Sequence, residues 1–247
     1  MTIDDVEVAR RAARAAADVL MTLRAQGELT GRALGDAGDA AAQRAILAAL
    51  TADRPDDVVF SEEAVDDPRR LTADRVWIVD PLDGTREYGE PGRHDWAVHV
   101  ALWSGGDLTA AAVALPALDE VLLTSPAPTP PARGNGAVRV AVSRSRPPAE
   151  AAAVAAVLDA ELVPLGSAGY KTLAVARGEV DAYVHSGGQY QWDSAAPVAV
   201  ARAAGLTTCR LDGAPLVYND PDPWLPDLVV CRPELAERIL GAILAAA

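Results

Sequence analysis

Apolar residues at helical spacing open the chain. From Asp4 to Ala25 they recur every three or four positions with arginines between them, a pattern typical of an amphipathic helix. The stretch from Gly27 to Gly38 is rich in glycine and predicts a loop. Asp39 is then expected to open a second helix and to cap its N-terminus, because aspartate is a favoured N-cap residue.

Short apolar runs predict the strands that follow. Val58–Phe60 leads into Glu62 and Glu63, and the run that begins at Val76 ends in Asp80. Little helical pattern separates the next three runs, which favours an antiparallel sheet. These runs are Ala97–Trp103, Thr109–Leu115 and Glu120–Thr124.

A proline- and glycine-rich segment, residues 126–136, divides the chain. We expect it to connect an N-terminal α+β half, residues 1–125, to a C-terminal α/β half, residues 137–247. In the second half strands and helices alternate, which favours an α/β layer. The expected strands are 138–143, 161–165, 181–185, 207–211 and 228–231, and the expected helices are 149–158, 171–177, 194–204 and 234–244.

Composition narrows the class of protein. With 247 residues, half of them hydrophobic, the chain can bury a large core. A net charge of −13 without a long basic run argues against a nucleic-acid duplex as partner. No apolar run reaches transmembrane length, and the N-terminus lacks the pattern of a signal peptide, so we expect a cytoplasmic protein with no membrane partner. Cys209 and Cys231 are expected to be buried apolar residues rather than a disulfide.

The segment Asp80–Thr85, which reads Asp-Pro-Leu-Asp-Gly-Thr, carries the strongest chemical signal. A β-turn there would bring the Cα atoms of Asp80 and Asp83 within about 7 Å of each other. Both carboxylates could then reach one cation, and Mg²⁺ takes oxygen ligands from carboxylates and from substrate phosphate. The alternative is an acidic turn without function, since Asp, Pro and Gly are ordinary turn residues.

Two further acids share this placement at the end of an element. Glu62 follows a strand, and Asp193 precedes a helix whose first turn is expected to contain Pro197. Helix capping is the alternative role for Asp193. If these acids gathered around Asp80 and Asp83, they would raise one another's pKa unless cations were bound. With two Mg²⁺ ions the same group becomes a phosphoryl-transfer site.

Three motifs resemble the signatures of the inositol monophosphatase superfamily: Glu62-Glu63, the segment Trp77–Thr85, and Trp192–Ala196. The resemblance covers most of the chain. It implies a layered α-β-α-β-α sandwich of the inositol monophosphatase and fructose-bisphosphatase type. It also implies a homodimer and a lithium-sensitive phosphomonoesterase that uses two to three Mg²⁺ ions per site.

The resemblance further implies roles for individual residues. The implied metal ligands are four carboxylates and one backbone carbonyl: Glu62, Asp80, Asp83, Asp193 and Leu82. Asp39 and Thr85 would activate the nucleophilic water, and Glu62 would orient the water of a third, weaker ion. The amides of Gly84 and Thr85 would hold the phosphate.

The sequence after the core motif points to a branch of the superfamily. Thr85-Arg86-Glu87-Tyr88 resembles the CysQ-like branch, which removes the 3′-phosphate of 3′-phosphoadenosine 5′-phosphate (PAP), with the sulfated PAPS as a further substrate. Arg86 is a candidate partner for a second phosphate, with a solvated surface arginine as the alternative. The expected substrate contacts are Asp83, Gly84, Thr85, Arg86, Gly166, Ser167, Ala168, Lys171 and Asp193.

Other functions remain open at this point. Inositol 1-phosphate or fructose 1,6-bisphosphate could be the substrate, because specificity resides in contacts remote from the metals. A non-catalytic phosphate sensor on the same fold is a second alternative. A haloacid-dehalogenase-like mechanism is disfavoured, since that design places its two acids two residues apart, whereas Asp80 and Asp83 are three apart.

The remaining conspicuous residues carry weaker expectations. His94, His99 and His185 lack the spacing of metal ligands. The glycines at 187 and 188 predict a turn that could line the pocket, and among the tryptophans Trp192 is the one expected near the site.

Overall fold

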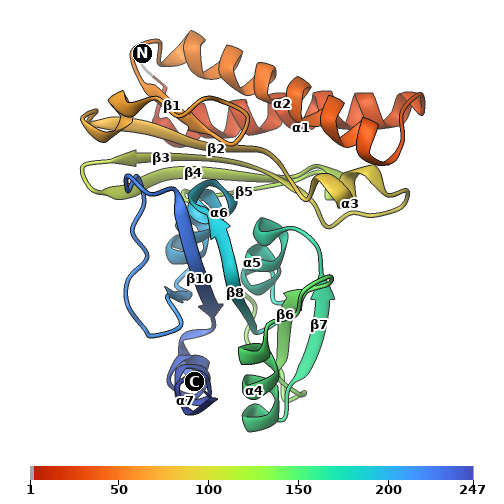
Figure 1. The fold of residues 1–247 in the computed structure, drawn as a ribbon, viewed down its shortest axis with the longest axis vertical. Coiled ribbons are helices and arrows are strands. Elements are labelled where there is room, and N and C mark those ends of the chain that lie inside the picture. Colours follow the sequence, from red (N-terminus) through yellow and green to blue (C-terminus); the bar gives the residue numbers. More distant parts are fainter. Residues whose placement is uncertain (1–2, 247) are drawn as a thin grey trace.

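The computed structural model describes residues 3–246, in which two five-stranded sheets alternate with three layers of helices (Figure 1). The outer layer contains α1 (Asp5–Gln26) and α2 (Gly31–Asp53), the layer between the sheets contains α5 (Ala168–Ala176) and α6 (Gln191–Ala203), and the far layer contains α4 (Ala149–Leu158) and α7 (Ala236–Ala246). This arrangement confirms the α-β-α-β-α sandwich. Three short 3₁₀ helices, Pro68–Leu71, Pro116–Leu118 and Pro233–Leu235, lie in connections.

The first sheet has the strand order β1-β2-β3-β4-β5, and its strands are β1 (Val58–Ser61), β2 (Arg75–Asp83), β3 (Ala97–Ser104), β4 (Asp107–Leu115) and β5 (Glu120–Leu123). β1 runs parallel to β2, and the other pairs are antiparallel, as the sequence predicts for the last three strands.

The second sheet has the order β7-β6-β8-β10-β9, and its strands are β6 (Arg139–Ser143), β7 (Glu161–Leu165), β8 (Ala182–Tyr190), β9 (Thr207–Cys209) and β10 (Trp224–Cys231). β6 is parallel to both β7 and β8, whereas β10 is antiparallel to its two neighbours.

Strand β2 lies between two cores. Trp77 and Val79 pack against the outer helices, whereas Val76 and Ile78 pack into the core between the two sheets. Because successive side chains of a strand point to opposite faces, a strand buried on both faces is apolar at every position. This explains the unbroken apolar run that leads to Asp80.

The core between the sheets joins the two halves of the chain. Ile78 of β2, Val198 of α6 and Val230 of β10 belong to one cluster of fully buried side chains. The division of the chain at residues 126–136 stays a prediction, because this cluster shows only that the halves share a core.

The expected loop at residues 27–38 is found only at residues 27–30, because α2 already begins at Gly31. Asp39 therefore lies inside the helix and does not cap it. A Cβ atom on Gly35 would lie 2.6 Å from Thr85 Cγ2, and one on Gly38 would lie 2.7 Å from the ring of Tyr88. The glycines thus permit close packing of α2 on the short helix α3 (Thr85–Gly89), which the sequence did not predict.

Other element boundaries also differ from those expected. Gly187 and Gly188 lie within β8 instead of in a turn, because Trp224 of β10 covers the position that a side chain on Gly188 would occupy. α6 begins at Gln191, so Pro197 lies in its second turn, and β10 begins at Trp224. Both cysteines are free and buried. Among the described residues, no helix combines the length and apolarity needed to cross a membrane.

Candidate active site

Three carboxylates from distant parts of the chain meet at the end of β2. Asp80, Asp83 and Asp193 each offer an oxygen atom, and these atoms lie within 4.8 Å of one another. The two residues of β2 are brought together by a β-bulge, since Asp80 pairs with His99 and Asp83 with Ala97. The Asp80 carboxylate accepts a hydrogen bond from the Leu82 amide at 3.0 Å, which holds the bulge.

Glu62 extends this group from the neighbouring strand. β1 runs parallel to β2, and the Glu62 amide donates to the Val79 carbonyl at 3.3 Å. Burial of its carboxylate among protein atoms, followed by the charges of Asp39 and Asp83, raises the pKa of Glu62 to about 7. The carboxylate thus shares the electrostatic environment of the β2 acids, although the residue retains solvent exposure.

The electrostatics of the group fit a bound cation. Burial, then Glu62 and Asp83, raise the pKa of Asp80 well above its ordinary value, and burial, then Asp83, raise that of Asp193 to about 7. The Oδ2 atom of Asp80 is buried without a hydrogen-bond partner among the described residues. Crowded carboxylates with an unused buried oxygen are the donor set that a hard divalent cation requires.

Asp83 differs from its neighbours because polar groups surround it. It accepts hydrogen bonds from the Ser167 hydroxyl at 2.5 Å and from the amides of Ala168 and Gly169 at 3.1 and 2.6 Å. Burial alone would raise the pKa of Asp83, but His99, Ser167 and Lys171 outweigh it and lower that pKa to about 2. His99 first, and then Ser167 and Lys171 of the α5 region, therefore hold this carboxylate in its charged form.

Asp39 and Thr85 face the same region from α2 and α3. Burial, followed by the charge of Glu63, raises the pKa of Asp39 to about 7, and its Oδ1 atom has no partner among the described residues. The Thr85 hydroxyl donates to the Leu82 carbonyl at 3.1 Å rather than to Asp39. It nevertheless lies near enough to counteract part of the rise in the Asp39 pKa.

Asp193 takes part in a helix cap and also lies in the acidic cluster. Its Oδ2 atom accepts a hydrogen bond from the Tyr190 amide at 2.6 Å, in a capping box at the start of α6. Its carboxylate also belongs to the acidic cluster. The cap fixes the side chain in the orientation that faces β2.

A cavity of about 360 Å³ opens beside the cluster. Asp83 and Asp193 line it together with three of the expected substrate contacts: Ser167, Ala168 and Lys171. Four other expected contacts, Gly84, Thr85, Arg86 and Gly166, lie outside its lining. Arg86 is exposed on α3 and pairs with Glu90 at 3.1 Å, so its part in specificity stays a prediction.

The cavity wall adds residues that the sequence analysis missed. Arg146 contributes a cation, and Tyr190 and Trp224 contribute aromatic rings that remain 42% and 44% exposed. Tyr190 stacks on Trp192, with ring centroids 4.7 Å apart, and contacts the edge of Trp224 at 5.4 Å. A basic residue soon after a strand in an acidic chain was the only sequence signal for Arg146.

His99 is a further missed residue. Its ring is fully buried, with Nδ1 3.1 Å from the Trp192 carbonyl oxygen and Nε2 3.3 Å from Asp83 Oδ2. A lone histidine in a strand gives no sequence signal for such a position, because the partners come from β2 and α6.

The layered fold and the acidic cluster are those of a metal-dependent phosphatase. A model of the inositol monophosphatase family matches residues 2–246, and the chain belongs to this family.

Several relatives support the assignment. The chain is 54% identical over 218 residues to the 3′-phosphoadenosine 5′-phosphate phosphatase of Mycobacterium tuberculosis, covering 85% of this chain and 82% of the relative. It is 49% identical over 254 residues to the protein of the same name from Mycobacterium leprae, covering 98% and 94%. The crystal structure of CysQ from Bacteroides thetaiotaomicron matches with a TM-score of 0.79 and 25% identity, covering 92% of this chain and 97% of that one.

Proposed function

We propose that this protein removes the 3′-phosphate of PAP by attack of water, giving AMP and inorganic phosphate. The observation that carries the proposal is the cavity beside the acidic cluster, which combines two cations with two exposed aromatic rings. A substrate with a second phosphate and a purine base matches both features, whereas an inositol phosphate offers no base. The names of the mycobacterial relatives support the same substrate.

We further propose that the acidic cluster holds two to three Mg²⁺ ions. Glu62, Asp80 and the Leu82 carbonyl would hold one ion, and Asp80, Asp83 and Asp193 a second. Glu62 would also orient a water molecule of a third ion. Bound Mg²⁺ would neutralise charge on the phosphate and lower the pKa of a bound water.

The chain's own residues would move the proton of the attacking water. The Thr85 hydroxyl would turn from the Leu82 carbonyl toward Asp39, and Asp39 would accept the proton that Thr85 passes on. A general base works best with a pKa near the operating pH, and the pKa of Asp39, about 7, meets this requirement. The amides of Gly84 and Thr85, at the start of α3, would hold the phosphate oxygens.

The second phosphate would lie against Arg146 and Lys171. Burial lowers the pKa of Lys171 to about 8, so its ammonium group keeps its charge at neutral pH. Its Nζ atom donates to the Gly166 and Ser167 carbonyls at 3.2 and 2.6 Å, which orients it. Guanidinium pairs bidentately with phosphate, so Arg146 would supply the geometric selectivity.

One assay tests the proposal. Phosphate release is compared for PAP, PAPS, inositol 1-phosphate and fructose 1,6-bisphosphate, each with Mg²⁺ and with EDTA. We expect the highest kcat/KM for PAP and no release in EDTA. A higher kcat/KM for inositol 1-phosphate or fructose 1,6-bisphosphate would refute the substrate assignment, and no release from any ester would indicate a phosphate sensor.

A further inference from the structure

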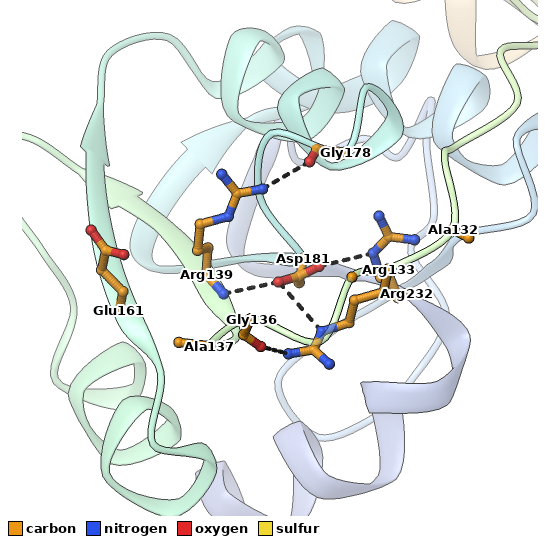
Figure 2. A pocket seen from close by; sticks show the side chains of 10 residues that line it. Ala132, Arg133, Gly136, Ala137, Arg139, Glu161, Gly178, Asp181 and Arg232 are labelled. Atoms are coloured by element: carbon orange, nitrogen blue, oxygen red, sulfur yellow. Dashed lines mark hydrogen bonds and ion pairs between the residues drawn. The ribbon is translucent and has the colours of Figure 1, made fainter.

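A second cavity, of about 300 Å³, lies between residues 132–137, at the end of the connecting segment, and the second sheet (Figure 2). Three arginines line it: Arg133 of the connector, Arg139 of β6 and Arg232, which follows β10. Asp181 lies between them, just before β8 begins. Tyr190 of the active-site cavity is the last residue of β8, and Asp193 follows it in α6. At the usual rise per residue of a strand, Tyr190 is roughly 30 Å from Asp181.

The Asp181 carboxylate is shared by two of the three arginines, Arg232 and Arg133 (Figure 2). The carboxylate accepts a hydrogen bond from Arg232 Nε at 3.0 Å and another from the Arg139 amide at 3.0 Å. Arg232 and Asp181 are 6% and 4% exposed, so they form a buried ion pair. Arg133 approaches the same carboxylate only to 3.7 Å.

Backbone carbonyls accept the hydrogen bonds of the Arg139 and Arg133 guanidinium groups. Arg139 Nη2 donates to the Gly178 carbonyl at 2.9 Å, and within residues 3–246 no carboxylate oxygen lies within 4.0 Å of its guanidinium. Arg133 Nη2 donates to the Gly136 carbonyl at 2.6 Å, and its buried Nε, 3.7 Å from Asp181 Oδ2, has no partner at hydrogen-bond distance within residues 3–246. Glu161, the neighbour of Arg139 on β7, is exposed and forms no ion pair with it in this part of the chain.

This pocket therefore places three arginines against two carboxylates, Asp181 and Glu161, in a chain whose net charge is −13. A donor that lacks an acceptor destabilises the folded protein, and a bound anion would supply the acceptor. We propose that the pocket is a second binding site, which takes a small phosphate-bearing anion on Arg133 and Arg139. No aromatic side chain of the described residues lines it, so the ligand would be recognised by its phosphate groups and not by a base.

Calorimetric titration with pyrophosphate tests this site independently of catalysis. The titration is done in EDTA, where the uncompensated carboxylates of the active site repel anions. We expect one equivalent to bind to the wild-type protein, and at least tenfold weaker binding to Arg139→Gln and to Arg133→Gln. Arg69→Gln, at a 79% exposed side chain, removes the same charge elsewhere and serves as the matched control. Arg232 is left intact because its loss would leave Asp181 buried without its partner.

Two controls separate this pocket from the active-site cavity and from misfolding. Arg146→Gln alters the active-site cavity and is expected to bind pyrophosphate as the wild type does, and Arg139→Gln is expected to keep the wild-type melting temperature and rate with PAP. Absence of binding to the wild type would overturn the proposal. Wild-type affinity in both Arg139→Gln and Arg133→Gln, or loss of binding in Arg146→Gln, would overturn it as well.

Discussion

His99 Nε2 lies 3.3 Å from Asp83 Oδ2, and Nδ1 of the same ring lies 3.1 Å from the Trp192 carbonyl oxygen. The bond to Trp192 requires a proton on Nδ1, because a carbonyl oxygen only accepts. One buried ring thus joins β3, the bulge of β2 and the start of α6. We therefore expect the ring to influence the separation between the carboxylates of Asp83 and Asp193, on which any shared cation depends.

Asp83→Asn is expected to lower kcat/KM for PAP by orders of magnitude, because it removes one charge from the proposed metal ligands. Phosphate release under saturating Mg²⁺ measures the effect. Asp74→Asn, at an exposed position just before β2, makes the same chemical change away from the site and should retain wild-type rates. A near-native rate for Asp83→Asn would remove Asp83 from the ligand set.

His99→Gln is expected to raise the Mg²⁺ concentration needed for half-maximal activity by about 10–100-fold, the usual effect of losing a group that orients a ligand. Activity should recover substantially at high Mg²⁺, which a general folding defect would not allow. His94→Gln, at an exposed histidine, is the matched control. An unchanged Mg²⁺ dependence would show that His99 serves only packing.

Arg146→Gln is expected to lower kcat/KM for PAP by about 10–100-fold, the worth of a charge-assisted hydrogen bond, and to affect inositol 1-phosphate much less. Arg86→Gln removes the same charge outside the cavity, so we expect a smaller loss on PAP. Steady-state kinetics on both substrates measure the difference. A larger PAP-specific loss in Arg86→Gln than in Arg146→Gln would indicate that Arg86, as the sequence predicts, binds the second phosphate.

Removal of metal is expected to destabilise the protein more at pH 8 than at pH 5. Without a cation, the folded-state pKa values of Glu62 and Asp193 are about 7, above the ordinary values of 4.5 and 3.8. The folded state therefore binds more protons than the unfolded state between about pH 4 and 7, and the free energy of unfolding falls as pH rises through this window. Mg²⁺ offsets the repulsion that appears when the protons leave.

Thermal unfolding with Mg²⁺ and with EDTA measures this effect. The gain in melting temperature from Mg²⁺ should be largest near pH 8 and should shrink toward pH 5. Asp193→Asn should reduce the gain at pH 8, because it removes one of the groups that titrate. A gain that did not change with pH would contradict the assigned cation site.

The sequence by itself determined the layered fold and the positions of the acids. The unbroken apolar run at 76–79 indicated a buried strand, and the motif that follows it identified the family through its resemblance. These features are local, because an apolar run and a contiguous motif can be recognised without knowing which distant residues they contact.

Tertiary structure decided everything that depends on packing between distant segments. Gly35 and Gly38 predict a loop by composition, yet they lie in a helix, at positions that Thr85 and Tyr88 approach too closely for a side chain. The environment of Asp83 is set by His99 and by the N-terminus of α5, which are distant in sequence. Arg146 and Trp224 line one cavity, although the sequence separates them widely, because the second sheet and its adjoining loops bring them together. Such contacts carry no local signal, since each residue taken alone suits an ordinary surface or core position.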